Sequence, residues 1–333
     1  MLLILVWAIV ISFAIFMYVL LDGFDLGIGI LFPWIKSHQE RDIMISTILP
    51  VWDGNETWLV FGGASLYAAF PLAYSTLLPA LYLPLILMLV ALIFRGIAFE
   101  FRFRVKNKSR IWDISFAAGS ITAAFSQGLI VGTFVQGFGH SLPVNASAYS
   151  WFTPFSVMTG IAVIIGYALL GSSWLIIQTV GELQERMYRI AKRSLIALTV
   201  MLIIVSLWTP FIEPSIMTRW FSLPNIFYLA PLPVLSGATL IYNFYSLNKR
   251  NVQNERLPFL LTTLLFIFSY LGFCISDWPY IIPHAVTLWD AASPPSSLKF
   301  TIVGVIILLP FLLGYTFYSY HVFRGKVTQT HEY

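Results

Sequence analysis

Nine stretches of about 20 predominantly apolar residues run through this chain, and short connections separate them. A helix of that length crosses the hydrocarbon core of a bilayer. Only 10% of the residues are charged, whereas a soluble globular protein carries about 25%, so this chain cannot cover itself with polar groups in water. We predict an all-α, multi-pass membrane protein with one integral membrane domain over residues 1–333. Its predicted spans are residues 2–30, 50–72, 77–101, 112–135, 155–180, 194–212, 224–247, 257–276 and 299–322.

The basic residues indicate how these spans are oriented. All but three of the 19 Lys and Arg residues lie in the connections after the first, third, fifth and seventh spans or in the C-terminal tail; the exceptions are Arg95, Arg219 and Lys299. Cytoplasmic loops are enriched in Lys and Arg, so the N-terminus is predicted outside and the C-terminus in the cytoplasm. The basic charge is therefore a topology signal with anionic lipid as its neighbour, and nucleic acid is not needed to explain it.

The metal-binding and thiol residues are few. Five histidines and one cysteine, Cys274, exclude a disulfide framework, a Cys-ligated zinc site and an iron–sulfur cluster. The histidines fall in predicted loops or near the C-terminal end, and none sits in the middle of a span, where a b-type haem would need its axial ligand. We therefore expect no haem bound through His in this chain and no metal site.

The first span carries its charges at its cytoplasmic end, in the stretch DGFDLGIG. Asp22 and Asp25 are three residues apart, so they share a helix face. Gly23 and Gly27 form a pair of small residues on a neighbouring face, which allows another helix to approach closely. Ionisable residues at membrane depth are costly and are candidates for function.

The next two spans also place charges at their cytoplasmic ends. PVWDGNETWLV puts Asp53 and Glu56 one helical turn apart, and the third span ends with Arg95 and Glu100. Brought together at the same depth, five acids and one Arg would resemble the mouth of a proton path. The structural alternative is that charges at helix ends simply reach the lipid headgroups. Because short Asp side chains reach poorly, the functional interpretation is favoured for Asp25, Asp53 and Arg95 together.

These same stretches carry a family resemblance. DGFDLGIG, PVWDGNETWL and FRGIAFEFR resemble the second subunit of the cytochrome bd-type quinol oxidases (cytochrome d ubiquinol oxidase subunit II), including the cyanide-insensitive branch. The likeness continues through TVGEL at 179–183 and YIIP…TLWDA at 280–291, so it covers nearly the whole chain.

The resemblance implies a fold and a set of partners. The fold would be two four-helix bundles plus one peripheral helix, in a bacterial cytoplasmic membrane. The complex would oxidise quinol and reduce dioxygen to water in aerobic respiration, with b-type and d-type haems in a partner, the haem-bearing subunit I. A bound quinone or lipid and a small accessory subunit are compatible with the resemblance, but no motif assigns residues to them.

The resemblance also ranks the candidate residues. Asp25 matches the second acid of the first motif, Trp52 and Asp53 match the WD pair, and Arg95 matches the Arg that ends the third span. Glu100 stands where many relatives carry Asp, and Glu56 varies within the family. We therefore expect Asp53 to be the principal proton-handling residue, with Glu56 as a helper at most. If the haems were lost without Asp53, Trp52 and Asp53 would instead brace the subunit interface.

Two other functions remain open from the residues alone. Buried acids are also expected in a proton-coupled secondary transporter. Against that alternative, the sequence contains no inverted repeat, and its acids gather at one surface and not at the midplane. A purely structural membrane scaffold is the other alternative.

Overall fold

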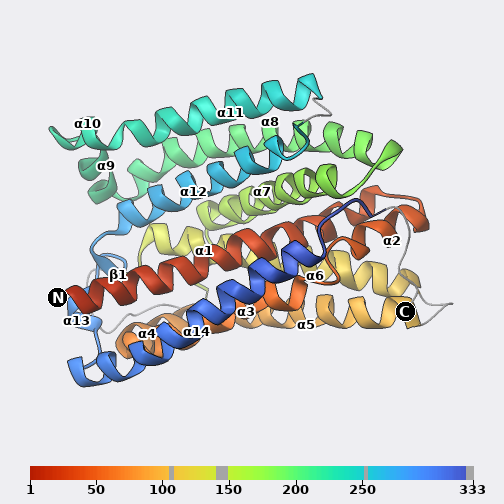
Figure 1. Cartoon of the computed structure of the whole chain (residues 1–333). Coiled ribbons are helices and arrows are strands. Elements are labelled where there is room, and N and C mark those ends of the chain that lie inside the picture. Colours follow the sequence, from red (N-terminus) through yellow and green to blue (C-terminus); the bar gives the residue numbers. More distant parts are fainter. Residues whose placement is uncertain (105–108, 140–148, 251–253, 328–333) are drawn as a thin grey trace.

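The computed structural model describes residues 1–104, 109–139, 149–250 and 254–327, and these residues are almost entirely helical. Long helices run roughly parallel through the molecule, with the N-terminus at one end and the C-terminus at the other (Figure 1). Within the described residues, eight helices are long and apolar enough to cross a membrane. The predicted all-α membrane fold is confirmed.

The elements follow one another in a simple order (Figure 1). Long helices form the body, and shorter elements lie at its two ends. Their bounds are α1 Leu2–Leu31, η1 Phe32–Trp34, α2 His38–Ser46, α3 Trp52–Ala69, α4 Pro71–Ala80, α5 Tyr82–Arg104, α6 Ser109–Gln136, α7 Pro154–Gln178, α8 Gly181–Ile212, α9 Pro214–Phe221, α10 Asn225–Leu229, α11 Pro231–Lys249, α12 Leu257–Asp277, β1 Tyr280–Ile282, β2 Val286–Thr287, α13 Leu288–Ala291 and α14 Pro295–Val322.

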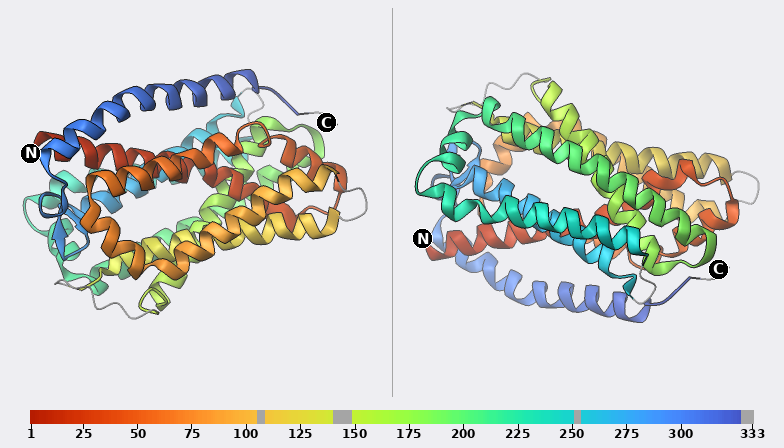
Figure 2. Two further views of the ribbon diagram at one scale, coloured as in Figure 1. Left: turned by 90° about the horizontal axis from the view of Figure 1, so that it is seen from below. Right: turned by 90° about the horizontal axis from the view of Figure 1, so that it is seen from above.

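The long helices fall into two groups of four. In the first group α1 packs on α3 and α6, and α5 packs on α6; in the second, α7 packs on α8 and α11 on α12. The close contacts of α1 and α6 with α7 join the two groups. α14 lies along the outside and touches chiefly α3, as both views in Figure 2 show. This is the arrangement of two bundles plus a peripheral helix that the resemblance implied.

Each predicted span has a helical counterpart, but several of the predicted ends are shifted. The second predicted span, 50–72, is α3, which ends at Ala69 and is followed directly by α4. α3 is not among the eight apolar helices, because its first two turns carry Asp53, Asn55 and Glu56. α8 begins at Gly181, well before the predicted 194, since its charged first turns continue the helix beyond the apolar segment. α11 begins at Pro231, after the separate short helix α10.

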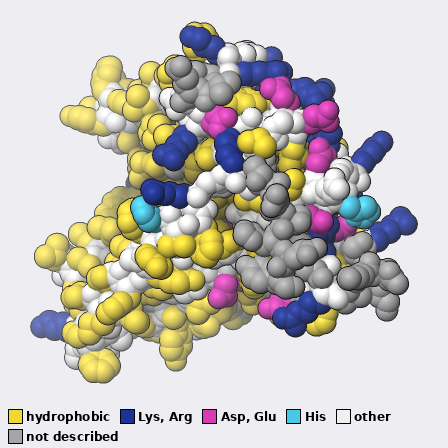
Figure 3. Space-filling view, turned by 45° about the vertical axis from the view of Figure 1, so that its right-hand side comes forward, with side chains coloured by type: hydrophobic (Ala, Val, Ile, Leu, Met, Phe, Trp, Pro, Cys, Tyr) yellow, Lys and Arg dark blue, Asp and Glu magenta, His cyan; other side chains and the backbone are white. Residues whose placement is uncertain are grey.

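The two ends of the molecule differ in composition. α9, α10, α13 and the β1–β2 pair lie at the end that holds the N-terminus, and α2 lies at the opposite end (Figure 1). Lys and Arg side chains gather at the end with α2 and the C-terminus (Figure 3). By the positive-inside rule that end faces the cytoplasm.

Candidate functional site

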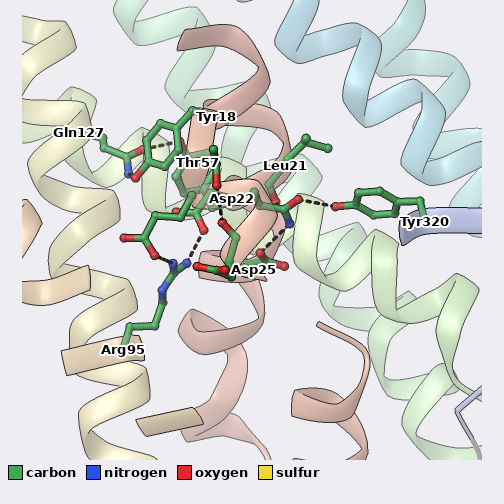
Figure 4. Close-up of polar contacts among 12 residues, drawn as sticks. Tyr18, Leu21, Asp22, Asp25, Thr57, Arg95, Gln127 and Tyr320 are labelled. Atoms are coloured by element: carbon green, nitrogen blue, oxygen red, sulfur yellow. Dashed lines mark hydrogen bonds and ion pairs between the residues drawn. The ribbon is translucent and has the colours of Figure 1, made fainter. Parts of the chain in front are cut away.

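Arg95 is the centre of a polar cluster buried near the cytoplasmic end of the first bundle. Its guanidinium binds Asp22 of α1 through Nη1 and Glu56 of α3 through Nη2, which lies 3.1 Å from Glu56 Oε2. Neither Arg95 nor Asp22 is exposed to solvent. One planar guanidinium thus joins α1, α3 and α5 (Figure 4). This geometry favours arginine over lysine, because the N–H donors of a guanidinium have fixed directions and can bind two carboxylates at once.

Asp25 joins this cluster through Asn55. The Asn55 side-chain amide donates to Asp25 Oδ2 at 2.8 Å and lies 3.4 Å from the Leu21 carbonyl oxygen. On its other side, Asn55 Oδ1 accepts a hydrogen bond of 2.9 Å from the hydroxyl of Tyr320, on α14 (Figure 4). Asn55 therefore connects α1 to the peripheral helix. We call Asp22, Asp25, Asn55, Glu56 and Arg95 together the Arg95 cluster.

Close helix packing holds α1 in position for this cluster. A Cβ atom at Gly27 would lie 1.9 Å from the backbone oxygen of Tyr167 on α7, and one at Gly23 would lie 2.7 Å from the Tyr167 ring. Only glycine permits this approach. The predicted role of Gly23 and Gly27 in bringing a second helix close is confirmed, and that helix is α7.

The charges of the Arg95 cluster do not balance if every acid is ionised. Asp22 and Glu56 share one guanidinium, and Asp25 is bound only by the neutral Asn55 amide. Full ionisation would therefore leave two uncompensated negative charges in and beside a buried site, which is strongly unfavourable. Asp22 Oδ2 and Asp25 Oδ1 accept no hydrogen bond from any residue that the structure describes, and Arg95 Nε donates none there. The cluster can therefore take up protons on its carboxyls.

Two of the predicted acids lie outside the cluster. Asp53 is exposed, because it stands two residues before the buried Asn55 and so projects from nearly the opposite side of α3. Glu100 is 59% exposed and pairs with Arg104, one turn along the same helix, at 3.4 Å. The expectation that all six charges gather is therefore wrong for Asp53 and Glu100. It holds for Asp22, Asp25, Glu56 and Arg95.

Trp52 braces the cluster from inside this chain. Its ring lies 5.0 Å from the ring of Phe99 on α5, and the Arg95 guanidinium carbon lies 6.0 Å from each of these rings. Such contacts between a cation and aromatic faces add to the ion pairs. Trp52 thus fixes α3 against α5 beside Arg95.

A second charged group, which the sequence analysis missed, lies closer to the cytoplasm. Arg102 of α5 binds Asp42 of α2 and also Asp113 of α6, with 2.6 Å between Nε and Oδ1. Arg41 binds the other oxygen of Asp113 at 2.7 Å and donates to the Ile35 carbonyl. We call Arg41, Asp42, Arg102 and Asp113 the cytoplasmic charge network. Its charges balance, and it ties α2 to α5 and α6.

Metal chemistry finds no support in the described part of the chain. No group of three or more His, Cys, Asp or Glu side chains there is arranged to hold a metal ion. The three described histidines lie at the start of α2, between β1 and β2, and in the last turn of α14.

Known proteins resemble this chain over nearly its full length. The sequence is 27% identical over 333 residues to cytochrome bd ubiquinol oxidase subunit 2 of Bacillus subtilis, covering 97% of this chain and 96% of that protein. It is 24% identical over 363 residues to cytochrome bd-I ubiquinol oxidase subunit 2 of Escherichia coli K12, covering 97% and 95%.

The fold has a solved counterpart. A chain in the structure of bd oxidase from Geobacillus thermodenitrificans superposes with a TM-score of 0.80, covering 97% of this chain and 99% of that one at 17% identity. The profile of the family described as cytochrome bd terminal oxidase subunit II matches residues 3–323. This chain belongs to the cytochrome bd terminal oxidase subunit II family.

Proposed function

We propose that this chain, as subunit II of a bd-type quinol oxidase, carries protons inward from the cytoplasm and supports the subunit that reduces dioxygen. Reduction of one dioxygen to two waters consumes four protons, which need a route through protein. The Arg95 cluster is the observation that carries this proposal, because it gathers three proton-accepting carboxyls, two of them wholly buried, at the cytoplasmic ends of α1 and α3. The transporter alternative is set aside, since the chain belongs to an oxidase family.

Each member of the cluster has a distinct task in this route. Arg95 supplies a permanent positive charge, because a guanidinium stays protonated in proteins. Asp22 binds that charge directly, and Asp25 is held by the neutral Asn55 amide, so Asp25 is the carboxyl that is free to gain and lose a proton. Asp25 therefore relays protons, while the positive charge of Arg95 compensates a carboxylate of the cluster.

The haems of the complex belong, in this proposal, to the partner subunit I. When bound there they carry electrons from quinol to dioxygen.

The test is the substitution Asp25→Asn in the assembled oxidase. It removes the relay carboxyl but keeps its shape and a hydrogen-bonding group. Loss of a proton-transfer group lowers rates by about 10²–10⁴-fold when that step limits turnover, so quinol-driven oxygen consumption should fall at least tenfold with full haem absorbance. Asp290→Asn, at an exposed position of the short helix α13, is the control and should leave the rate unchanged. A normal rate in Asp25→Asn contradicts the proton route, and loss of haem absorbance assigns Asp25 a structural role instead.

A further inference from the structure

Aromatic rings close the direct approach from the cytoplasm to the Arg95 cluster. Between ring centroids, Trp52 lies 5.0 Å from Phe99, Phe99 lies 5.1 Å from Phe116, and Phe116 lies 5.0 Å from Phe32. Phe32, Phe99 and Phe116 are buried. These four rings come from α3, α5, α6 and η1, and we call them the aromatic layer.

The aromatic layer lies between the two charged groups. Arg95, Phe99 and Arg102 follow one another along α5 at intervals of four and three residues, so they occupy one helix face on successive turns. Arg95 belongs to the inner cluster and Arg102 to the cytoplasmic charge network. Phe99 therefore marks the depth at which a proton moving straight inward would have to cross apolar side chains.

The cytoplasmic charge network seals the outer side of this layer. Both of its arginines contact the Phe32 ring, with the guanidinium carbons of Arg41 and Arg102 at 5.3 Å and 5.6 Å from the ring centre. Its carboxyls, Asp42 and Asp113, are both ion-paired to these arginines. Because the network has two carboxyls for two arginines, protonating either carboxyl would leave an arginine charge uncompensated, whereas Arg95 keeps Asp22 when Glu56 is protonated.

Glu56 offers a different way in. Its side chain is 27% exposed, whereas Asp22, Asp25 and Arg95 are wholly buried. Glu56 also follows Asn55 directly, and the Asn55 amide binds Asp25. Among the acids of the Arg95 cluster, Glu56 alone therefore touches both the surface of this chain and the buried site.

We propose that protons reach the Arg95 cluster sideways, through Glu56 at the surface of α3, and that the Glu56–Arg95 ion pair opens each time a proton passes. This inference rests on the proposed function of the cluster as a proton route. A hydronium ion at the surface gives a proton to the Glu56 carboxylate: one O–H bond of hydronium breaks, one forms on Glu56, water is left behind, and Arg95 is released. The O–H bond on Glu56 breaks when the proton moves on to the Asp25 carboxylate, and Glu56 then pairs with Arg95 again. No group is oxidised or reduced.

The first experiment replaces the carboxyl in the intact oxidase. Glu56→Gln should lower quinol-driven oxygen consumption about tenfold or more while the haem spectrum stays complete, and Glu56→Asp should recover part of the rate. Glu185→Gln is the matched control, because Glu185 is also paired to an arginine, Arg250, at 2.5 Å but lies in the second bundle. Its rate should be that of the unaltered oxidase.

The outcomes separate this inference from the proposed function. A normal rate in Glu56→Gln together with a slow Asp25→Asn variant overturns sideways access and leaves the proton route standing. Normal rates in both variants overturn the two proposals together.

A second experiment tests the aromatic layer as the barrier. Phe99→Ala, made in the Glu56→Gln background, opens a path for water from the cytoplasmic side and should restore at least a third of the lost rate. When Glu56→Gln is tenfold slow, the double variant should then reach about fourfold its rate. Phe99→Ala alone measures the effect of removing this ring from beside Arg95, and its rate is the reference for the double variant; if it loses haem, Phe99→Val serves instead. No recovery in a haem-complete double variant shows that the aromatic layer is not the barrier, and overturns that part of the inference.

Discussion

Arg95 on α5 and Asp22 on α1, 73 residues apart in the sequence, form an ion pair in which neither side chain is exposed. Taking two charges out of water is expensive, and their attraction offsets that expense only when the geometry is good. The pair therefore tells less about net stability than about position: α1 and α5 have to meet at one register for both charges to be satisfied.

Removing the Arg95 guanidinium should strongly destabilise the protein. Arg95→Gln leaves Asp22 buried without a counter-charge, and breaking a buried pair in this way costs about 3–5 kcal/mol. We expect a lower thermal midpoint of the purified oxidase and a lower yield of haem-containing complex. Arg250→Gln is the control, since Arg250 and its partner Glu185 are both about half exposed, and an exposed pair contributes about 0–1 kcal/mol. Equal stability of the two variants would falsify the importance assigned to the buried pair.

The approach of α1 to α7 predicts a steric effect without any change of charge. Gly27→Ala places a methyl group 1.9 Å from the Tyr167 backbone oxygen, and a backbone atom cannot move aside as a flexible side chain can. We expect the two bundles to separate locally and the assembled complex to be lost from detergent extracts on native gels. Gly237→Ala, on α11, meets nothing within 4 Å and should assemble normally. Normal assembly of Gly27→Ala would contradict the packing described here.

Much of the fold could be predicted because the bilayer restricts it. Apolar length indicated the spans, and the small pair Gly23 and Gly27 indicated a close helix neighbour. The identity of that neighbour could not be predicted, since nothing in DGFDLGIG specifies Tyr167, which lies 140 residues further along the chain. Helix ends also shifted wherever charged turns continued an apolar helix, as they do at the start of α8.

The sequence predicted most residues of the candidate site, but not which acid of α3 pairs with Arg95. Motif likeness favoured Asp53 over Glu56, yet Glu56 pairs with Arg95 while Asp53 is exposed. Spacing alone shows that two acids share a helix face, but it does not show which side of that helix meets α1. Asn55 supplies the answer: it is buried against Asp25, and its place between the two acids in WDGNE was the available signal.

Asp53 nevertheless has a testable place in the route. It lies exposed, one turn before Glu56, so we expect it to collect protons from water and pass them to Glu56. Asp53→Asn should slow quinol-driven oxygen consumption less than Glu56→Gln does, because water can also reach Glu56 directly. Haem absorbance should stay complete. A normal rate removes Asp53 from the route, and loss of haem shows that Trp52 and Asp53 together brace the subunit interface.

Substituting Asn55 should lower turnover and stability more than substituting Tyr320, its hydrogen-bonding partner on α14. Asn55→Val removes the amide that binds Asp25 and the oxygen that accepts from Tyr320, and it leaves two buried polar groups without partners, at about 1–3 kcal/mol each. Turnover should fall together with stability, since Asp25 loses the contact that orients it. Tyr320→Phe removes only the outer hydroxyl, so its stability should fall by about 1 kcal/mol and its rate much less than in Asn55→Val. Both quantities are measured on the same preparations, as oxygen consumption and thermal midpoint. If Tyr320→Phe slows turnover as much as Asn55→Val, the decisive contact is the one with α14, and the orienting role belongs to Tyr320.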